Sequence, residues 1–386
     1  MMENRLPGRL PALDGLRGVA ILMVISAHGA DGWQRALLAF RDDVGAQPLL
    51  LPRWLHLVAA DGAYGVELFF IVSAFTLTAG WLRGRTALGA YAVRRVLRIG
   101  PAYWIAGCAY TAAGLVTVGG PPLLFAPHGT GPLDWVTAAL FASAWLGGAS
   151  LAVVPGGWSV SCEATFYLAL PLLLFAVNRS RGRAMVLVAI SLLTAQVFAR
   201  RVILAHGFDN AAFFNPLAHA PLFALGIAGA ICAWAAAPRR IPGAFDLLLL
   251  VLAIFVLPLE TSGDRVLMPH LRFGVVAAVA VTLAALSPSA LLENRLLRKI
   301  GEVSYSMYLI HFAVLPASLW AAEQVFPRDD AWTFLVHVTL TTAVTFAVSC
   351  VTYRYVETPF VNWSHTALAP RPRAQDADAT TPSTPG

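Results

Sequence analysis

Long apolar runs recur along almost the whole chain, separated by short stretches that carry arginine, glycine and proline. Ten of these runs are long and apolar enough to predict membrane-spanning helices. They cover residues 13–28, 65–81, 99–119, 158–177, 183–204, 213–236, 245–259, 273–291, 303–322 and 332–355. The runs do not alternate between apolar and polar positions as the strands of a membrane barrel do. The pattern therefore predicts an all-α, polytopic membrane protein with ten transmembrane helices.

An eleventh apolar run, residues 133–151, is predicted to be a re-entrant or interfacial segment. Residues 99–178 contain no lysine or arginine, as expected for a loop on the outer side of the membrane flanked by two spans. If residues 133–151 do not cross, most of the basic loops fall on the same side as the N-terminus. Because cytoplasmic loops collect lysine and arginine, we expect both termini to be cytoplasmic.

The same pattern divides the chain into three parts. Residues 1–9 are predicted to be a cytoplasmic segment, and residues 10–360 form the membrane domain. Residues 361–386, rich in proline, alanine, threonine and aspartate, are predicted to be a disordered cytoplasmic tail. The first apolar run offers no clear small-residue cleavage site, so we do not expect a cleaved signal peptide.

Composition narrows the classes further. With 58% hydrophobic and 12% charged residues among 386, an ordinary soluble domain is excluded. The net charge of +6 lies mostly in short inter-helix loops, which topology explains better than nucleic-acid binding. The four cysteines lie in apolar runs without CxxC spacing, so we expect neither a disulfide framework nor a metal site.

Three ionisable residues inside predicted spans need an explanation, because such groups cost a few kcal/mol each on insertion scales. His28 is a candidate general base, or a helix-end histidine that is hydrogen-bonded to backbone or water. Glu163 could orient His28, stabilise its charge or bind an acceptor hydroxyl, and it could equally be a structural partner of an arginine. His311 is a secondary candidate, since histidines at such positions are more often packed in a core. Asp14 and Arg17, three residues apart, are predicted to form an architectural ion pair.

An arginine cluster precedes the third predicted span. Arg95 and Arg98, three residues apart, lie on one helical face and can bind a diphosphate or 3′-phosphate through bidentate hydrogen bonds, with Arg94 beside them. The alternative is that the cluster only anchors the cytoplasmic side. Pro101 is predicted to lie in the first turn of the next helix. The chain has no P-loop, no GxSxG, no HExxH and no Rossmann glycine motif.

The order of several short motifs resembles that of the membrane-bound acyltransferase family 3. These motifs are Leu13-Asp-Gly-Leu-Arg-Gly ending in His28, Gly65-Val-Glu-Leu-Phe-Phe-Ile-Val-Ser-Ala-Phe75, Arg95-x-x-Arg98-Ile-x-Pro101, Trp158-Ser-x-x-x-Glu163-x-x-Phe-Tyr167, Ser304-Tyr-x-x-Tyr-Leu-x-His311 and Glu357-x-Pro359-Phe360. The resemblance covers nearly the whole chain. Two positions depart from the family pattern: Ala74 stands where glycine is usual, and Gly100 where leucine is usual.

The resemblance implies ten transmembrane helices and transfer of an acyl group, commonly acetyl, from acyl-CoA to a hydroxyl group. In that case His28 and Glu163 are the catalytic candidates, and Arg94, Arg95 and Arg98 are the donor-binding ones. Supporting or acceptor-binding candidates are Asp14, Arg17, Ser73, Trp158, Tyr167, Tyr305, Tyr308 and His311. It implies acyl-CoA as a co-substrate, with no metal and no permanently bound cofactor. The expected acceptor is a hydroxyl-bearing glycan or glycosylated metabolite.

Two other classes of function stay open. A transporter or flippase of a glycan or lipid could use the same buried polar residues, although inverted repeats and broken helices are not visible. A membrane scaffold would have little use for His28 together with Glu163. Heavy arginine and alanine usage with a single lysine, Lys299, is typical of a GC-rich bacterial genome, so we expect the bacterial plasma membrane.

Overall fold

A computed structural model describes residues 6, 8–44, 62–84, 87–114, 130–146, 152–206, 213–236, 267–287, 289–327 and 331–367. In these ranges the chain forms helices and turns and no strand, so the all-α fold is confirmed. The elements are α1 (Pro11–Val44), η1 (Gly62–Tyr64), α3 (Gly65–Arg83), α4 (Leu88–Ala112), α5 (Pro132–Ala139), η2 (Ser143–Trp145), α6 (Gly157–Val177), α7 (Arg181–His206), α9 (Pro216–Ala236), α11 (Leu267–Leu286), α12 (Arg295–Glu302), α13 (Ser304–Glu323), α14 (Ala331–Thr352), η4 (Tyr353–Glu357) and α15 (Thr358–Ala367).

The described residues contain seven helical stretches that are long and apolar enough to cross a membrane. They are Pro11–Ala30, Gly62–Arg83, Gly157–Val177, Arg181–Val202, Pro216–Ala236, Ser304–Glu323 and Ala331–Ala367. Each overlaps one predicted span, which confirms a polytopic membrane protein. Residues 245–259 lie outside the described part, and predicted span 273–291 corresponds to the shorter apolar stretch His270–Leu286. Ten spans therefore stay a prediction.

The arginine cluster lies inside a helix. Helix α4 is continuous from Leu88 to Ala112, and Pro101 lies in its interior rather than in the first turn of a new helix. The predicted position of Pro101 was therefore wrong. Because α4 starts before the arginines, Arg94, Arg95 and Arg98 project from a regular helix with defined directions.

The segment 133–151 has no spanning helix in its described part. Helix α5 has eight residues, which corresponds to about 12 Å of helix against a ~30 Å hydrocarbon core. The short η2 follows it. This is the geometry expected of a segment that enters the protein without crossing the membrane.

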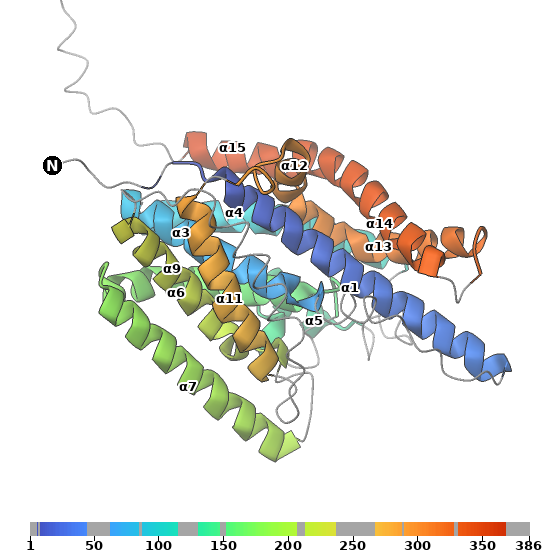
Figure 1. The fold of residues 1–386 in the computed structure, drawn as a ribbon, viewed down its shortest axis with the longest axis horizontal. Coiled ribbons are helices and arrows are strands. Elements are labelled where there is room, and N and C mark those ends of the chain that lie inside the picture. Colours follow the sequence, from blue (N-terminus) through green and yellow to red (C-terminus); the bar gives the residue numbers. More distant parts are fainter. Residues whose placement is uncertain are drawn as a thin grey trace, which may run out of the picture.

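Helix α1 runs along the centre of the bundle, and α7 lies at its periphery (Figure 1). The N-terminal turns of α1 pack directly on α12. A Cβ atom built on Gly15 would lie 1.9 Å from the carbonyl oxygen of Leu292, and one on Gly301 would lie 1.7 Å from that of Asp14. Only glycine allows this approach of the two backbones.

The unusual alanine in the second predicted span does not prevent a close helix contact. Ala74 on α3 is fully buried, and a Cβ atom on Gly226 of α9 would lie 2.7 Å from the Ala74 Cβ. The small residue that lets the backbones approach is therefore on the facing helix.

The C-terminal helices form one bent unit. Helix α14 continues through the π-helical turn η4 into α15. Helix α15 follows α14 end to end along one edge of the bundle (Figure 1) and packs on α4. The predicted disordered tail, residues 361–386, is helical as far as Ala367, so the predicted boundary was wrong. Residues 368–386 lie outside the described part.

Candidate functional site

A cavity of about 150 Å³ lies between helices α1, α3, α4, α6 and α13. Its walls are formed by Arg17, Val66, Phe69, Phe70, Ser73, Thr76, Leu77, Arg95, Arg98, Ile99, Ser159, Val160, Glu163, Tyr167, Ser304, Tyr305 and Tyr308. Eight of the thirteen predicted site residues are in this wall, namely Arg17, Ser73, Arg95, Arg98, Glu163, Tyr167, Tyr305 and Tyr308. The other five, Asp14, His28, Arg94, Trp158 and His311, are not in it. Five helices far apart in sequence thus bring predicted polar residues to one space.

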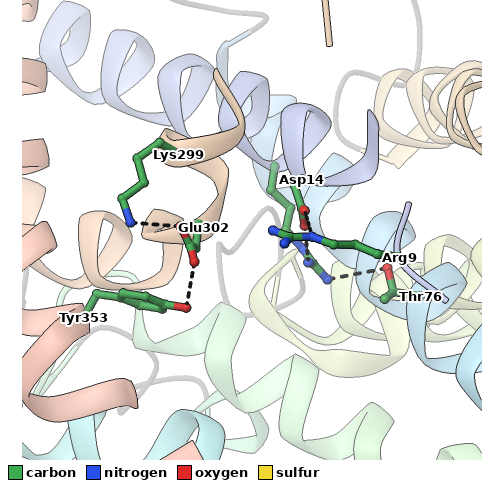
Figure 2. Close-up of polar contacts among 7 residues, drawn as sticks. Arg9, Asp14, Thr76, Lys299, Glu302 and Tyr353 are labelled. Carbon is green, nitrogen blue, oxygen red and sulfur yellow. Dashed lines mark hydrogen bonds and ion pairs between the residues drawn. The ribbon is translucent and has the colours of Figure 1, made fainter. Parts of the chain in front are cut away.

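Three arginine side chains make the cavity basic. Arg98 forms an ion pair with Glu357 of η4. Arg17 Nη1 lies 3.7 Å from Asp14 Oδ1, and Arg17 Nη2 lies 3.5 Å from the Thr76 hydroxyl oxygen. The predicted ion pair of Asp14 and Arg17 is present. Arg9 Nε also lies 3.3 Å from Asp14 Oδ2, and Figure 2 shows the Arg9 side chain reaching Asp14.

Arg95 is held by aromatic rings. Its guanidinium carbon lies 5.9 Å from the ring centroid of Tyr91 and 5.6 Å from that of Tyr167. No carboxylate in the described part of the chain forms an ion pair with it, and its buried Nε has no hydrogen-bond partner there. Arg95 therefore presents to the cavity a guanidinium that forms no ion pair with the described carboxylates, and Glu163 lines the same cavity.

Glu163 is the acidic group of the cavity wall. Its Oε1 accepts a hydrogen bond from the Ser73 hydroxyl at 2.5 Å and another from the Tyr167 hydroxyl. Tyr167 thus links this carboxylate to Arg95, because its ring lies under the guanidinium. Glu163 belongs to the arginine side of the site, and its hydrogen bonds do not involve His28.

Hydroxyl groups line another part of the wall. The Ser159 hydroxyl donates to the Tyr308 hydroxyl oxygen at 2.8 Å, and Tyr308 donates to the Gly156 carbonyl at 3.0 Å. Gly156 precedes α6 with φ +75°, and a Cβ atom there would lie 2.6 Å from the Tyr308 oxygen. Glycine is required at this position for both reasons.

His28 lies in a stack of rings next to this wall. Its ring centroid is 5.3 Å from that of His311 at 17°, and 4.5 Å from that of Phe312. His311 is fully buried, and its Nδ1 lies 2.7 Å from the Tyr308 carbonyl oxygen. Because a carbonyl only accepts, this contact assigns the proton of neutral His311 to Nδ1 and leaves the lone pair on Nε2.

Helical geometry relates the cavity to His28. Arg17 and His28 are eleven residues apart on α1, which places them on the same face about 16 Å apart. On α13, Tyr308 lines the cavity, and His311 lies one turn farther along with its ring 5.7 Å from that of Tyr308. His28 therefore lies outside the cavity wall, and the ring of His311 contacts both the His28 ring and that of the wall residue Tyr308.

Comparison with known proteins places these residues in a family. A family model described as an acyltransferase domain, acyltransferase family 3, matches residues 10–354. The chain belongs to acyltransferase family 3. The matched region includes the whole cavity wall and His28.

Several named relatives are similar to this family member. A Staphylococcus aureus protein named "Putative O-acetyltransferase" is 24% identical over 401 residues, covering 94% of this chain and 59% of the relative. The "Acyltransferase MdmB" of Streptomyces mycarofaciens is 28% identical over 338 residues, covering 80% of this chain and 79% of the relative. A Bacillus subtilis "Putative peptidoglycan O-acetyltransferase" is 24% identical over 385 residues, covering 91% and 54%. This chain thus spans little more than half the length of the first and third of these relatives. No solved structure matches the chain.

The family motifs do not reveal two contacts in this chain. Glu357 is the first residue of the last motif, but its contact with Arg98 joins residues 259 positions apart, which no local pattern predicts. The buried Glu67 contacts Nδ1 of the partly exposed His270 on α11, and the apolar start of α3 gave no sign of this contact.

Trp158 does not line the cavity and packs among aromatic rings behind Phe70 of its wall. Its ring lies 4.9 Å from Phe214 and 5.1 Å from His219. A packing role in the bundle accounts for this position. Among the described residues, no group of three or more His, Cys, Asp or Glu side chains could hold a metal ion.

Proposed function

We propose that this membrane acyltransferase moves an acyl group, most simply acetyl, from acyl-CoA to a hydroxyl group of a carbohydrate or glycosylated small molecule. The observation that carries the proposal is the cavity that begins at arginines and ends one side chain from His28. The names of the relatives support an O-acyl product. The class of acceptor is suggested by the names of the relatives alone.

The arginine side of the cavity suits the phosphorylated end of acyl-CoA. Guanidinium groups bind phosphate oxygens through paired, charge-assisted hydrogen bonds. Arg95 has those donors available at the wall, beside Arg98. The acyl-bearing arm of the donor would then extend along α1 and α13 toward His28, and its thioester would meet the acceptor there.

His28 acts as the general base in this proposal. It takes the proton of the acceptor hydroxyl as that oxygen attacks the thioester carbonyl carbon. The C–S bond then breaks, and the CoA thiolate receives the proton from the His28 imidazolium. In the alternative, an imidazole nitrogen of His28 attacks the thioester carbon and releases the CoA thiolate. The acceptor hydroxyl then displaces the imidazole from the acyl group, and its proton goes to the thiolate.

Glu163 supports the arginine side rather than the base. Its carboxylate fixes Tyr167, whose ring lies under Arg95, and its contact with Ser73 joins α6 to α3. We place the protein in the bacterial plasma membrane with both termini cytoplasmic, so the donor enters from the cytoplasm. A reporter fused to the C-terminus tests that orientation.

Purified protein supplied with acetyl-CoA labelled in the acetyl group tests the function. We expect acyl transfer or slow thioester hydrolysis by the wild-type protein and its loss in His28→Ala. His365→Ala, an exposed histidine on α15, is the matched control and should keep wild-type turnover. Equal melting temperatures of the variants show that the loss is chemical. Undiminished turnover in His28→Ala would remove His28 as the base.

A further inference from the structure

We propose that the two cavity arginines of α4 have different roles: Arg95 binds the anionic group of the donor, whereas Arg98 is held by Glu357 as a brace of the cavity wall. The inference rests on the proposed function, because it assigns a donor-binding role within it. It makes Glu357, from the opposite end of the chain, a positioning residue for the site.

Arg98 has a fully buried partner. Glu357 Oε2 accepts from Arg98 Nη1, and Glu357 Oε1 accepts from the hydroxyl of the buried Ser306. Both carboxylate oxygens therefore have donors. The Arg98 side chain is 32% exposed and that of Glu357 is 0% exposed. The guanidinium therefore neutralises the charge of a fully buried carboxylate. Removing the guanidinium leaves an isolated buried charge, which proteins tolerate poorly.

Further contacts fix Arg98 in place. Its guanidinium carbon lies 5.8 Å from the ring centroid of Tyr305. The Tyr305 hydroxyl donates to the carbonyl of Ile99, the residue after Arg98, at 2.7 Å. Arg98 is thus joined to α13 through Tyr305 and to the C-terminal unit through Glu357.

The π-helical turn η4 brings Glu357 to this position. A π turn contains an extra residue, so it rotates the following side chains relative to a regular helix. The Thr358 hydroxyl donates to the Tyr353 carbonyl at 2.8 Å, which caps one freed backbone acceptor. The turn therefore directs the Glu357 carboxylate toward α4 from the end of a helix that packs mainly on α13.

Arg95 is held in a different way. The rings of Tyr91 and Tyr167 orient its guanidinium without neutralising it. Tyr167 is itself fixed by its hydrogen bond to Glu163. A phosphate at Arg95 meets a guanidinium that contacts no described carboxylate, whereas Arg98 already donates to Glu357 and has fewer hydrogen-bond donors left for a ligand. The division of roles follows from this difference in neutralisation.

The test compares steady-state donor kinetics in two variants. Arg95→Gln should raise the KM for acetyl-CoA about tenfold or more, the size expected for a lost charge-assisted hydrogen bond, with kcat nearly unchanged. Arg98→Gln combined with Glu357→Gln replaces the ion pair by two amides that can hydrogen bond with each other. We expect this double variant to keep the donor KM within about twofold of wild type. Arg354→Gln, an exposed arginine next to Glu357 in η4, controls for general loss of positive charge.

A donor without phosphate separates binding from folding. Acetyl-pantetheine carries the same thioester, so Arg95→Gln should lose the wild-type preference for acetyl-CoA over it, and the double variant should retain that preference. A donor KM in the double variant that rises as much as in Arg95→Gln would overturn the inference. Arg98→Gln alone should melt at a lower temperature than the double variant, and equal melting temperatures would also contradict the brace. Wild-type protein that transfers no acetyl group from acetyl-CoA would instead refute the proposed function.

Discussion

The ring of Tyr308 lies 5.7 Å from the ring of His311, centroid to centroid, and only Tyr308 of the two lines the cavity. His311 in turn stacks on His28. The three rings therefore form a short path between the cavity and the candidate base. A change of side chain on that path is therefore expected to alter the packing around His28.

Replacing His311 separates ring packing from chemistry. We expect His311→Phe to keep the stack on His28 and to retain kcat within about threefold, whereas His311→Ala should lower kcat tenfold or more because it leaves a cavity beside His28. Radiolabelled acetyl transfer measures both. Loss of activity in His311→Phe as complete as in His28→Ala would mean instead that the Nε2 lone pair takes part in the reaction.

A substitution at Gly156 tests the packing around the hydroxyl groups of Ser159 and Tyr308 in the cavity wall. An alanine there must adopt φ +75° and place its Cβ 2.6 Å from the Tyr308 oxygen, so Gly156→Ala should destabilise the protein by about 1–3 kcal/mol. We expect a lower melting temperature together with lower kcat. Gly131→Ala is the control, because a Cβ there meets only the Asp134 carboxylate at 3.7 Å. A melting temperature of Gly156→Ala equal to that of the control would contradict the geometry.

The sequence predicted the spans better than it predicted the site. A bilayer demands about twenty apolar residues for each helix, so residues 158–177 could be recognised without knowing their neighbours. The contact of Arg98 with Glu357 depends on the π turn and on the packing of α15 against α4, and neither leaves a local pattern. The burial of Ala74 against Gly226 likewise depends on two helices meeting. For Glu163 the sequence left three roles open, namely orienting His28, binding an acceptor hydroxyl or pairing with an arginine. In the structure its carboxylate accepts from Ser73 and Tyr167 on the arginine side of the cavity.

The contact between α1 and α12 predicts a sensitive glycine. Gly301→Ala would place a Cβ 1.7 Å from the Asp14 carbonyl oxygen, so the backbones must move apart and carry Asp14 and Arg17 with them. We expect a lower melting temperature and a higher donor KM. Gly89→Ala on α4 is the control, since a Cβ there meets nothing within 4 Å and alanine favours helix by up to about 1 kcal/mol. Equal melting temperatures of the two variants would rule out the tight contact.

A pair of charges on α12 predicts a dependence of stability on pH. Lys299 Nζ lies 2.9 Å from Glu302 Oε2, and Tyr353 donates to Glu302 Oε1 at 3.2 Å, as Figure 2 shows. The hydrogen bond between Lys299 and Glu302 lowers the pKa of Glu302 and raises the pKa of Lys299. The Glu302 side chain is 36% exposed and that of Lys299 is 47% exposed. Solvent therefore screens the ion pair, and its contribution to the stability of the fold is small.

The sign follows from the lowered pKa of Glu302. A carboxylate whose pKa is lower in the folded state stabilises the protein above its unfolded pKa of about 4.3, and this stabilisation is lost as the pH falls through the folded value. We therefore expect wild type to melt about 1–3 °C above Glu302→Gln at pH 7, with the two melting temperatures converging near pH 3. Glu293→Gln, at a carboxylate outside the ion pairs of the described residues, should differ from wild type by the same amount at both pH values. If the gap between wild type and Glu302→Gln were constant from pH 7 to pH 3, the Lys299 contact would contribute nothing to folding.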